Sequence, residues 1–517
     1  MRILFSVRNP TYVRHYESVL RALAGHGHEI HLVMRPRRKG WPPSVLALVE
    51  ECPAIHLSTT PEVIHNPWWE LATQLRHARF YLRFLGPEFR HTPALLARAR
   101  TRSPRLAVRL AESIGRSQVG RRLLVRGIDL LEQSTRTADL FHAYLRTCQP
   151  DIVVLTPLVV LKTAQLDLGR AAAELGIRNV FAVASWDHLS SKGELTFVPQ
   201  KTIVWNEIQK REAIDFHHLE ADRVVVTGSQ LFDEWFDRQP STSREEFCAR
   251  AGLRPDRPIV LYACSSLIEG SAPESPFVLR WARHLRESGH PVLRDCGILV
   301  RPHFKRGNEW RGIDFAGLDN IVCWPPVGDV PADARSKADY FDSLHHAAVT
   351  VGLNTSAMIE AAILGRPVHT LLLPEFRENQ EGTLHFHYLL EGRDAVLRAT
   401  RSLDEHAGDL ASVLDGRDPD PDRSARFVRT FVRPCGLSTP ATAQFVAALE
   451  QLAAGPAPAP VPAPSWARWI RPMLRPFANA AVERVRRVEN ELRRQKEQAL
   501  VDHRERKAAL ARARRTS

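Results

Sequence analysis

Short apolar runs alternate with segments of helical periodicity along the first part of the chain. Residues 2–7, RILFSV, predict a buried strand, and a helix with apolar residues at every third or fourth position follows at about 12–24. Further strands are predicted at 30–35, 150–161, 179–186, 201–206 and 223–229. Strands that alternate with helices in this way indicate a parallel sheet with right-handed crossovers.

The same alternation starts again after a polar segment. Residues 237–245, DRQPSTSRE, predict a linker, and strands are predicted beyond it at 257–266, 297–303, 348–353 and 367–373. A helix at 440–453 ends this part. The pattern therefore predicts an α/β protein with two Rossmann-like, doubly wound domains, residues 1–236 and 246–453, that face each other.

Three segments fall outside this plan. Residues 66–147 lack strand signals and predict an inserted helical hairpin or bundle, and residues 454–465 predict a semi-extended Pro/Ala linker. Residues 466–517 predict a long amphipathic helical tail. Its apolar stripe is expected to consist of Trp466, Ile470, Met473, Phe477, Ala481, Val485, Val488 and Leu492.

The net charge of +13 is concentrated in the insertion and the tail, each of which carries 15 Lys/Arg against 6 Asp/Glu. In the insertion the arginines interleave with Trp68, Trp69, Phe80, Tyr81, Phe84 and Phe89. This pattern suits an anionic membrane surface or a charged lipid-linked acceptor, although a solvated helical face gives the same pattern. The tail suits a surface-lying membrane helix, a coiled-coil arm or a partly disordered extension. Nucleic acid is disfavoured, because no recognised module is present.

Several classes of protein are excluded or disfavoured. Neither domain opens with a GxGxxG or GxxxxGK[ST] loop, which argues against a dinucleotide oxidoreductase and a P-loop ATPase. The seven cysteines include no CxxC pair, so we expect neither a disulfide framework nor a metal site. The apolar runs are too short to span a membrane and the start does not resemble a signal peptide, so we expect a cytoplasmic protein.

The segment VGLNTSAMIEAAILGRPV, residues 351–368, contains the most specific chemistry. It predicts a strand, a short turn of Asn354, Thr355 and Ser356, and a helix that starts there. Helix starts expose free N–H groups that bind phosphate, and Glu360 lies one turn further on, on the side of Ser356. A carboxylate there could accept both ribose hydroxyls of a nucleotide. The alternative is a helix cap followed by an unrelated glutamate.

Other strand ends carry polar groups that a nucleotide-binding cleft would use. Arg301 and His303 suit a phosphate, and Ser265 and Ser266 could border a diphosphate. The segment SWDHLSSKG, residues 185–193, offers Asp187 or His188 as a base for an acceptor hydroxyl and Lys192 for phosphate. His15, at the start of the first helix, is a further candidate base. Each of these residues also has a purely structural interpretation, and LHFHYLL, residues 384–390, is interpreted as structural.

These motifs resemble the GT-B glycosyltransferase superfamily. TSAMIEAAILGRPV is similar to the donor-nucleotide segment of GT-B enzymes and to its counterparts in CDP-glycerol glycerophosphotransferases and UDP-GlcNAc 2-epimerases. VRPHF, residues 300–304, resembles a strand-end segment of the glycerophosphotransferases. VVVTGSQLFDEW, residues 224–235, is similar to the end of a GT-B N-terminal domain. The resemblance covers roughly residues 1–450. The catalytic acids of the epimerases have no match, and LYACSSLIEG lacks the tryptophan-containing loop of the glycerophosphotransferases.

The resemblance implies a transferase, and we expect it to need no cofactor or metal, because a helix start and cationic side chains can stabilise the departing diphosphate. Its second domain would bind a nucleotide-sugar donor through Thr355, Ser356, Glu360 and Arg301 or His303, and its first domain would bind a glycan or lipid-linked acceptor in surface polysaccharide assembly. The basic insertion and tail lie outside the resemblance, and their pattern predicts a cytoplasmic protein that can attach to the inner face of the cell membrane. The alternatives are a glycerophosphotransferase, a UDP-sugar 2-epimerase and a non-catalytic protein on the same scaffold.

Overall fold

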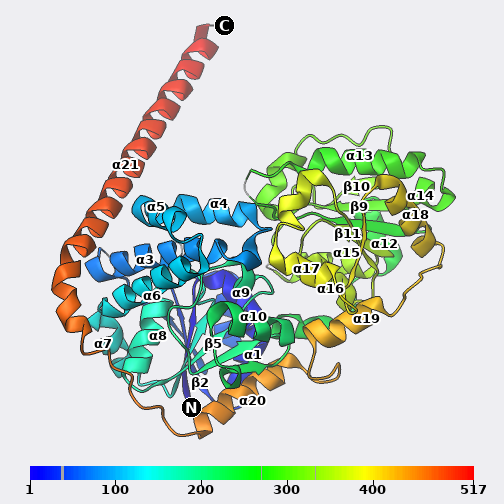
Figure 1. Cartoon of the computed structure of the whole chain (residues 1–517). Coiled ribbons are helices and arrows are strands. Elements are labelled where there is room, and N and C mark those ends of the chain that lie inside the picture. Colours follow the sequence, from blue (N-terminus) through cyan, green and yellow to red (C-terminus); the bar gives the residue numbers. More distant parts are fainter. Residues whose placement is uncertain (36–39, 64, 269, 332, 517) are drawn as a thin grey trace.

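The computed structural model describes residues 1–35, 40–63, 65–268, 270–331 and 333–516, and within these ranges the side chains of all residues except 496 and 499–516. It contains two parallel β-sheets, each covered by helices on both faces (Figure 1). The first sheet has the order β3-β2-β1-β4-β5-β6-β7 and the second has the order β10-β9-β8-β11-β12-β13. The predicted pair of doubly wound domains is therefore confirmed.

The strands of the first sheet are β1 (Arg2–Val7), β2 (Glu29–Met34), β3 (Ile55–Thr59), β4 (Ile152–Thr156), β5 (Arg178–Ala182), β6 (Lys201–Val204) and β7 (Val224–Val226). Those of the second are β8 (Ile259–Ala263), β9 (Gly297–Arg301), β10 (Ile321–Cys323), β11 (Val349–Gly352), β12 (Val368–Leu371) and β13 (Leu397–Thr400). The sequence analysis missed β3, β10 and β13. All three are edge strands, and none is buried along its whole length, so they lack a continuous apolar run.

The helices that cover the two sheets follow the predicted alternation. In the first domain these are α1 (Glu17–Gly25), α2 (Pro43–Glu51), α8 (Gln165–Glu174), α9 (His188–Ser191) and α10 (Glu207–His217). In the second they are α12 (Arg244–Ala251), α13 (Glu274–Glu287), α14 (Pro291–Asp295), α15 (Ala334–His345), α16 (Ala357–Ile363), α17 (Leu384–Leu390), α18 (Leu403–Leu414) and α19 (Arg423–Phe427).

The predicted helical insertion consists of α3 (Pro67–Phe84), α4 (Pro93–Arg102), α5 (Arg105–Ser113), α6 (Gln118–Ser134) and α7 (Asp139–Cys148), of which α7 packs on α8 of the first domain. Phe80, Tyr81, Phe84 and Phe89 form its buried core. Two arginines that precede them in α3 are also buried: Arg76 Nε donates to Glu132 Oε1 at 2.7 Å, and Arg79 Nη2 donates to Glu194 Oε1 at 2.7 Å. The Arg76–Glu132 bond holds the insertion together, and the Arg79–Glu194 bond joins it to the rest of the first domain. These buried side chains therefore do not form the membrane surface suggested by their pattern.

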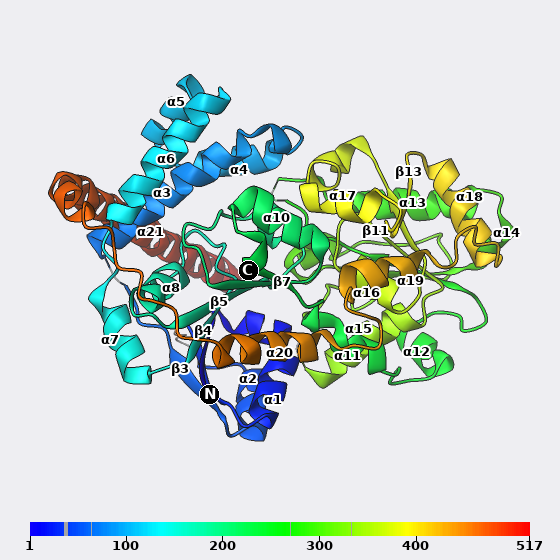
Figure 2. The same cartoon turned by 60° about the horizontal axis from the view of Figure 1, so that its bottom comes forward.

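The last helix of the globular part, α20 (Ala441–Ala454), packs on α1 rather than on the second domain (Figure 2). Its Phe445, Val446 and Leu449 lie in the core that contains β1, β2 and β4. The expected second domain, residues 246–453, therefore ends before this helix, and the chain returns to the first domain. The return is fixed by Asp233, which accepts hydrogen bonds from the backbone N–H groups of Ala441 at 3.1 Å and Thr442 at 2.6 Å.

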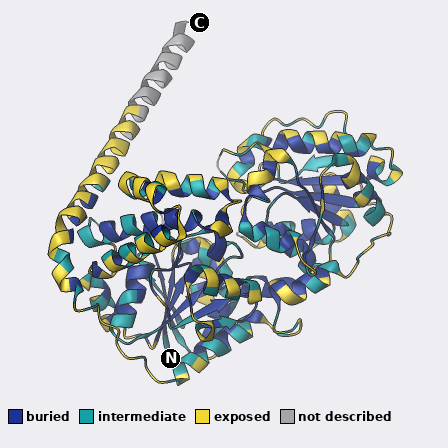
Figure 3. Ribbon diagram, viewed as in Figure 1, coloured by how far each residue is buried: buried dark blue, intermediate teal, exposed yellow. Residues whose placement is uncertain are grey.

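The tail forms one helix, α21 (Ala467–Thr516), that starts on the insertion and extends beyond it (Figures 1 and 3). Ile470, Leu474 and Ala478 pack against Leu71 and its neighbours on α3 and α6. Trp469, Met473 and Phe477 are 71%, 73% and 64% exposed. The predicted stripe is thus divided between a packed face and an outer face. Within the described part of the chain, no helix has the length and apolar character needed to cross a membrane.

Candidate functional site

A cleft of about 920 Å³ lies between the two domains. It is bordered by the segments that follow the carboxyl ends of β5, β8, β9 and β11, which is where doubly wound sheets place ligands. Of the predicted site residues, Asp187, Ser266, Arg301, His303, Asn354, Thr355, Ser356 and Glu360 line it. His15, His188 and Ser265 do not.

The turn before α16 has two sides. Asn354 is held inside the second domain: its backbone N–H donates to Ser265 Oγ at 3.0 Å, and its Nδ2 donates to the Asn379 carbonyl at 2.5 Å. Ser265 is fully buried and supports the turn. The prediction that it borders the cleft is therefore wrong. Ser356 is exposed and accepts a 3.3 Å hydrogen bond from Trp186 Nε1 of the first domain. This bond joins the domains across the cleft.

Glu360 is partly buried in the cleft and accepts a short hydrogen bond from the hydroxyl of Tyr340 on α15. Burial raises the pKa of this carboxyl to about 7, although the Tyr340 hydrogen bond and the nearby Arg14 and Arg301 oppose the shift. Glu360 therefore changes its charge near neutral pH. A carboxyl pKa raised this far is typical of a functional site in a cleft.

Arg301, at the end of β9, is nearly buried. Its guanidinium donates to Ser343 Oγ at 2.9 Å and to Asp329 Oδ1 at 3.3 Å, and it lies over the rings of Trp324 and Tyr340. His303 stacks on Phe304, and burial lowers its pKa to about 4. His303 is therefore neutral at pH 7, so the predicted pair of cationic groups contains one cation.

A second cation comes from the first domain. Arg14 is exposed and lines the cleft, and its Nε lies 3.4 Å from His15 Nε2. Among the residues that the structure describes, no carboxylate forms an ion pair with Arg14. Its charge is therefore available to an anionic ligand.

Asp187 is the most strongly held carboxylate of the cleft. Lys192 Nζ donates to its Oδ2 at 2.9 Å, and the hydroxyls of Ser185 and Ser191 donate at 2.7 Å and 3.0 Å. Burial alone would raise the pKa of Asp187, but Lys192, His188 and His385 hold it well below its usual value. A carboxylate in this environment is a weak proton acceptor.

The insertion fixes the segment that contains Asp187. Arg83 of α3 donates to the carbonyls of Leu189 and Lys192, the latter at 2.9 Å, and Arg98 of α4 donates to the Ser191 carbonyl at 2.7 Å. Buried arginine bonds of this type hold a loop in one conformation. The insertion therefore positions one wall of the cleft.

The two predicted histidine bases lie just outside the cleft. His188 is buried, its Nδ1 has no partner within the described residues, and burial lowers its pKa to about 4. His15 Nδ1 is 2.8 Å from the Ala184 carbonyl and must carry the proton, so Nε2 keeps a lone pair. Burial lowers the pKa of His15 to about 3.

Sequence reasoning missed Arg14, Tyr340 and His385 as residues of the cleft. His385, from the segment interpreted as structural, packs its ring edge-on against Trp186 with the centroids 4.7 Å apart. It therefore belongs to the same contact between the domains as Ser356. Sequence reasoning drew its candidates from strand ends and helix starts, and it did not select these three residues as part of the site.

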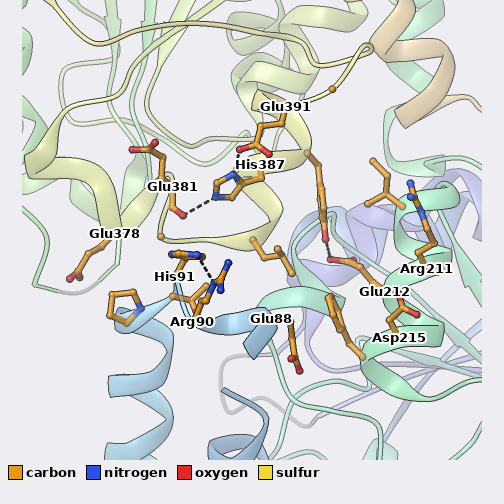
Figure 4. A pocket seen from close by; sticks show the side chains of 18 of the residues that line it. Glu88, Arg90, His91, Arg211, Glu212, Asp215, Glu378, Glu381, His387 and Glu391 are labelled. Atoms are coloured by element: carbon orange, nitrogen blue, oxygen red, sulfur yellow. Dashed lines mark hydrogen bonds and ion pairs between the residues drawn. The ribbon is translucent and has the colours of Figure 1, made fainter. Parts of the chain in front are cut away.

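A second cavity between the domains has a volume of about 1230 Å³ and lies among α10, α17 and the start of α4 (Figure 4). Its buried acid, Glu212, accepts a 2.7 Å hydrogen bond from the Tyr388 hydroxyl, while Oε2 has no partner among the described residues. Burial raises the pKa of Glu212 to about 7. The lining contains more acidic than basic side chains and includes Glu378, which also borders the first cleft.

One of three comparisons with known proteins, the comparison with solved structures, found similar folds. No protein-family model and no curated protein matched the chain. The structure is similar to that of a protein from Listeria monocytogenes assigned as a UDP-N-acetylglucosamine 2-epimerase, with a TM-score of 0.52 and 13% identity over 87% of this chain and 96% of that chain. A glycosyltransferase from Rickettsia africae gives 0.49 and 11% over 88% and 99%, and the wall teichoic acid polymerase TagF gives 0.46 and 10% over 87% and 89%. The predicted GT-B resemblance is confirmed at the level of the fold.

Proposed function

We propose that this protein is a GT-B transferase that moves a sugar from a nucleotide-sugar donor to a hydroxyl group of a glycan or lipid-linked acceptor. The observation that carries the proposal is the cleft between the domains, where Thr355, Ser356 and Glu360 of the second domain share one space with Arg14 and Asp187 of the first. Glycerol phosphate is the alternative transferred group. We also propose that the reaction takes place in the cytoplasm.

The donor nucleotide would lie on the second domain. The ionised Glu360 would accept the ribose hydroxyls, and the diphosphate would lie between the turn at 354–356 and the guanidinium groups of Arg14 and Arg301. Arg14 would contribute most to phosphate binding, since Arg301 already donates to Ser343 and Asp329. Two cations that stabilise a departing diphosphate lower the barrier to transfer.

The acceptor would be activated by His15. Its Nε2 has a lone pair that faces one donor, Arg14 Nε at 3.4 Å, whereas Asp187 accepts from three donors and His188 is enclosed. The weak basicity of His15 would rise when an anionic donor binds beside it, since negative charge favours the imidazolium form. The second cavity, which shares Glu378 with the cleft, suits the remainder of a hydroxyl-rich acceptor.

The test is nucleotide release from UDP-, GDP- and CDP-linked donors, with and without a hydroxyl acceptor. A transferase releases nucleotide faster with an acceptor, an epimerase converts the sugar without an acceptor and releases none, and a non-catalytic protein does neither. His15→Ala should lower kcat by about 10²- to 10⁴-fold with donor affinity retained. An unchanged kcat would show that His15 takes no part in the reaction. Asp187→Asn is the variant to compare with it, because Asp187 is the predicted base that lines the cleft.

The acceptor could be reached at a membrane. The outer face of α21 presents Trp469, Met473 and Phe477 beside Arg468 and Arg475, and α5 and α6 expose Leu106 and Leu123 among further arginines. Apolar side chains next to cations suit the surface of an anionic bilayer. In flotation with anionic liposomes, replacement of the three α21 side chains by serine should abolish binding, while neutral liposomes serve as the control. Unchanged flotation would exclude the tail as the contact.

A further inference from the structure

Three metal-ligating side chains meet at the end of the first domain opposite the cleft. His26 and His28 come from the turn between α1 and β2, and Glu450 comes from α20. His26 Nδ1 and His28 Nε2 each lie 2.9 Å from Glu450 Oε1, and the three atoms lie within 4.8 Å of one another. Within the described residues, this is the only group of three or more His, Cys, Asp or Glu side chains with that geometry.

The end of α1 fixes the two imidazoles. Gly27 has a φ of +78°, a left-handed conformation that lets the chain leave the helix between the two histidines. The backbone N–H groups of His26 and His28 donate to the carbonyls of Ala22 at 2.9 Å and Leu23 at 3.1 Å. His28 Nδ1 lies 3.4 Å from the Met1 nitrogen, which leaves Nε2 toward the carboxylate. The ring positions therefore come from the helix cap and not from the ion pair alone.

The donor set has the chemistry of a transition-metal site. Two imidazole nitrogens and one carboxylate oxygen form a known set of zinc ligands and leave the fourth position to water. Imidazole donors favour Zn²⁺ or Co²⁺ over Mg²⁺ and Ca²⁺. Solvent reaches the cluster, because the side chains of His26, His28 and Glu450 are 55%, 15% and 37% exposed.

We propose that His26, His28 and Glu450 bind a transition-metal dication of the Zn²⁺ type. The ion takes the place of the two imidazole protons that otherwise lie against Glu450; each ring then carries one proton on its other nitrogen, and the proton displaced from the contact between His28 Nδ1 and the Met1 nitrogen goes to solvent. It joins α20 to the first β-α-β unit, so it stabilises the return of the chain to the first domain. The role is structural, since none of the three residues lines the cleft.

The experiment uses the full chain without a polyhistidine tag, stripped with a chelator and titrated with ZnCl₂ against a chromophoric chelator. The expected result is one Zn²⁺ per chain and a thermal midpoint that rises with free zinc, because zinc at about 100 times Kd raises the folded-to-unfolded ratio about 100-fold. His26→Ala and Glu450→Gln should each weaken binding at least about tenfold. His56→Ala, an exposed histidine on β3, should bind as the wild type does.

His26→Ala is the decisive variant, because His26 is the most exposed member and its loss removes little packing. Absence of zinc binding by the wild type would overturn the proposal. Equal zinc affinity in the wild type and His26→Ala would overturn it as well. A loss of stability in the variants that is the same with and without zinc would show that the cluster is an ion pair only.

Discussion

Replacement of Glu360 by glutamine should make the stability of the protein less dependent on pH. The pKa of Glu360 is about 7 in the folded chain against 4.5 for the free side chain. A raised carboxyl pKa means that the folded state holds the proton more tightly, so this contribution to stability is present at low pH and is lost as the pH rises from 4.5 to about 7. Glutamine has no such dependence.

The expected size follows from the two pKa values. Ionisation of Glu360 costs the folded state about 3 kcal/mol at pH 8 and about 1 kcal/mol at pH 5. The free energy of unfolding of Glu360→Gln minus that of the wild type should therefore rise by about 2–3 kcal/mol between these two pH values. Urea unfolding followed by tryptophan fluorescence measures this difference.

Two further variants sharpen the result. Glu483→Gln removes a 58% exposed glutamate of α21 and is the control substitution at a solvent-exposed position. Tyr340→Phe removes the hydrogen bond that lowers the pKa of Glu360, so the pKa of Glu360 should be higher in this variant. The loss of stability that accompanies ionisation of Glu360 should therefore continue to a higher pH in Tyr340→Phe than in the wild type. A difference between Glu360→Gln and the wild type that does not change with pH would refute the assigned environment of Glu360.

The remaining predictions concern packing, domain closure and the second cavity. Arg76→Met should lower the free energy of unfolding in urea by about 3–5 kcal/mol, because Glu132 stays buried without its main partner. Adding Glu132→Gln should restore much of this free energy, and no recovery in the double variant would contradict the pairing. Trp186→Phe removes the hydrogen bond to Ser356 and should make the free energy of domain closure less favourable by about 1 kcal/mol. Calorimetry should show this as a few-fold higher Kd for the donor. Glu212→Gln should raise the acceptor KM and leave the donor KM unchanged, whereas a change in the donor KM alone would exclude this cavity as the acceptor site.

The central strands and the cleft could be predicted from the sequence because their signals are local. A strand buried on both faces gives a continuous apolar run, and the residue after such a strand lies at the carboxyl edge of the sheet. This reasoning placed Asp187, Arg301 and Ser356 in one cleft. It could not show which way a side chain points, and Ser265 therefore turned out to face the domain interior.

Features that depend on distant partners could not be predicted. The arginines of α3 indicated a charged surface, because their partners Glu132 and Glu194 lie 56 and 115 residues further along the chain. His28 and Glu450 are 422 residues apart, and no spacing rule connects them. Tyr340 is 20 residues from Glu360, on a different helix, so its effect on the pKa of Glu360 appears only in three dimensions.

The position of α20 has a consequence for the order in which the molecule is completed. Phe445, Val446 and Leu449 cover apolar side chains of α1 and the neighbouring strands, and the ribosome makes them after the whole of the second lobe. Until then the first lobe exposes a patch of its own interior. During synthesis the first lobe therefore needs either a chaperone on this patch or rapid completion of the chain. A fragment that ends between the lobes cannot form the complete core of the first lobe.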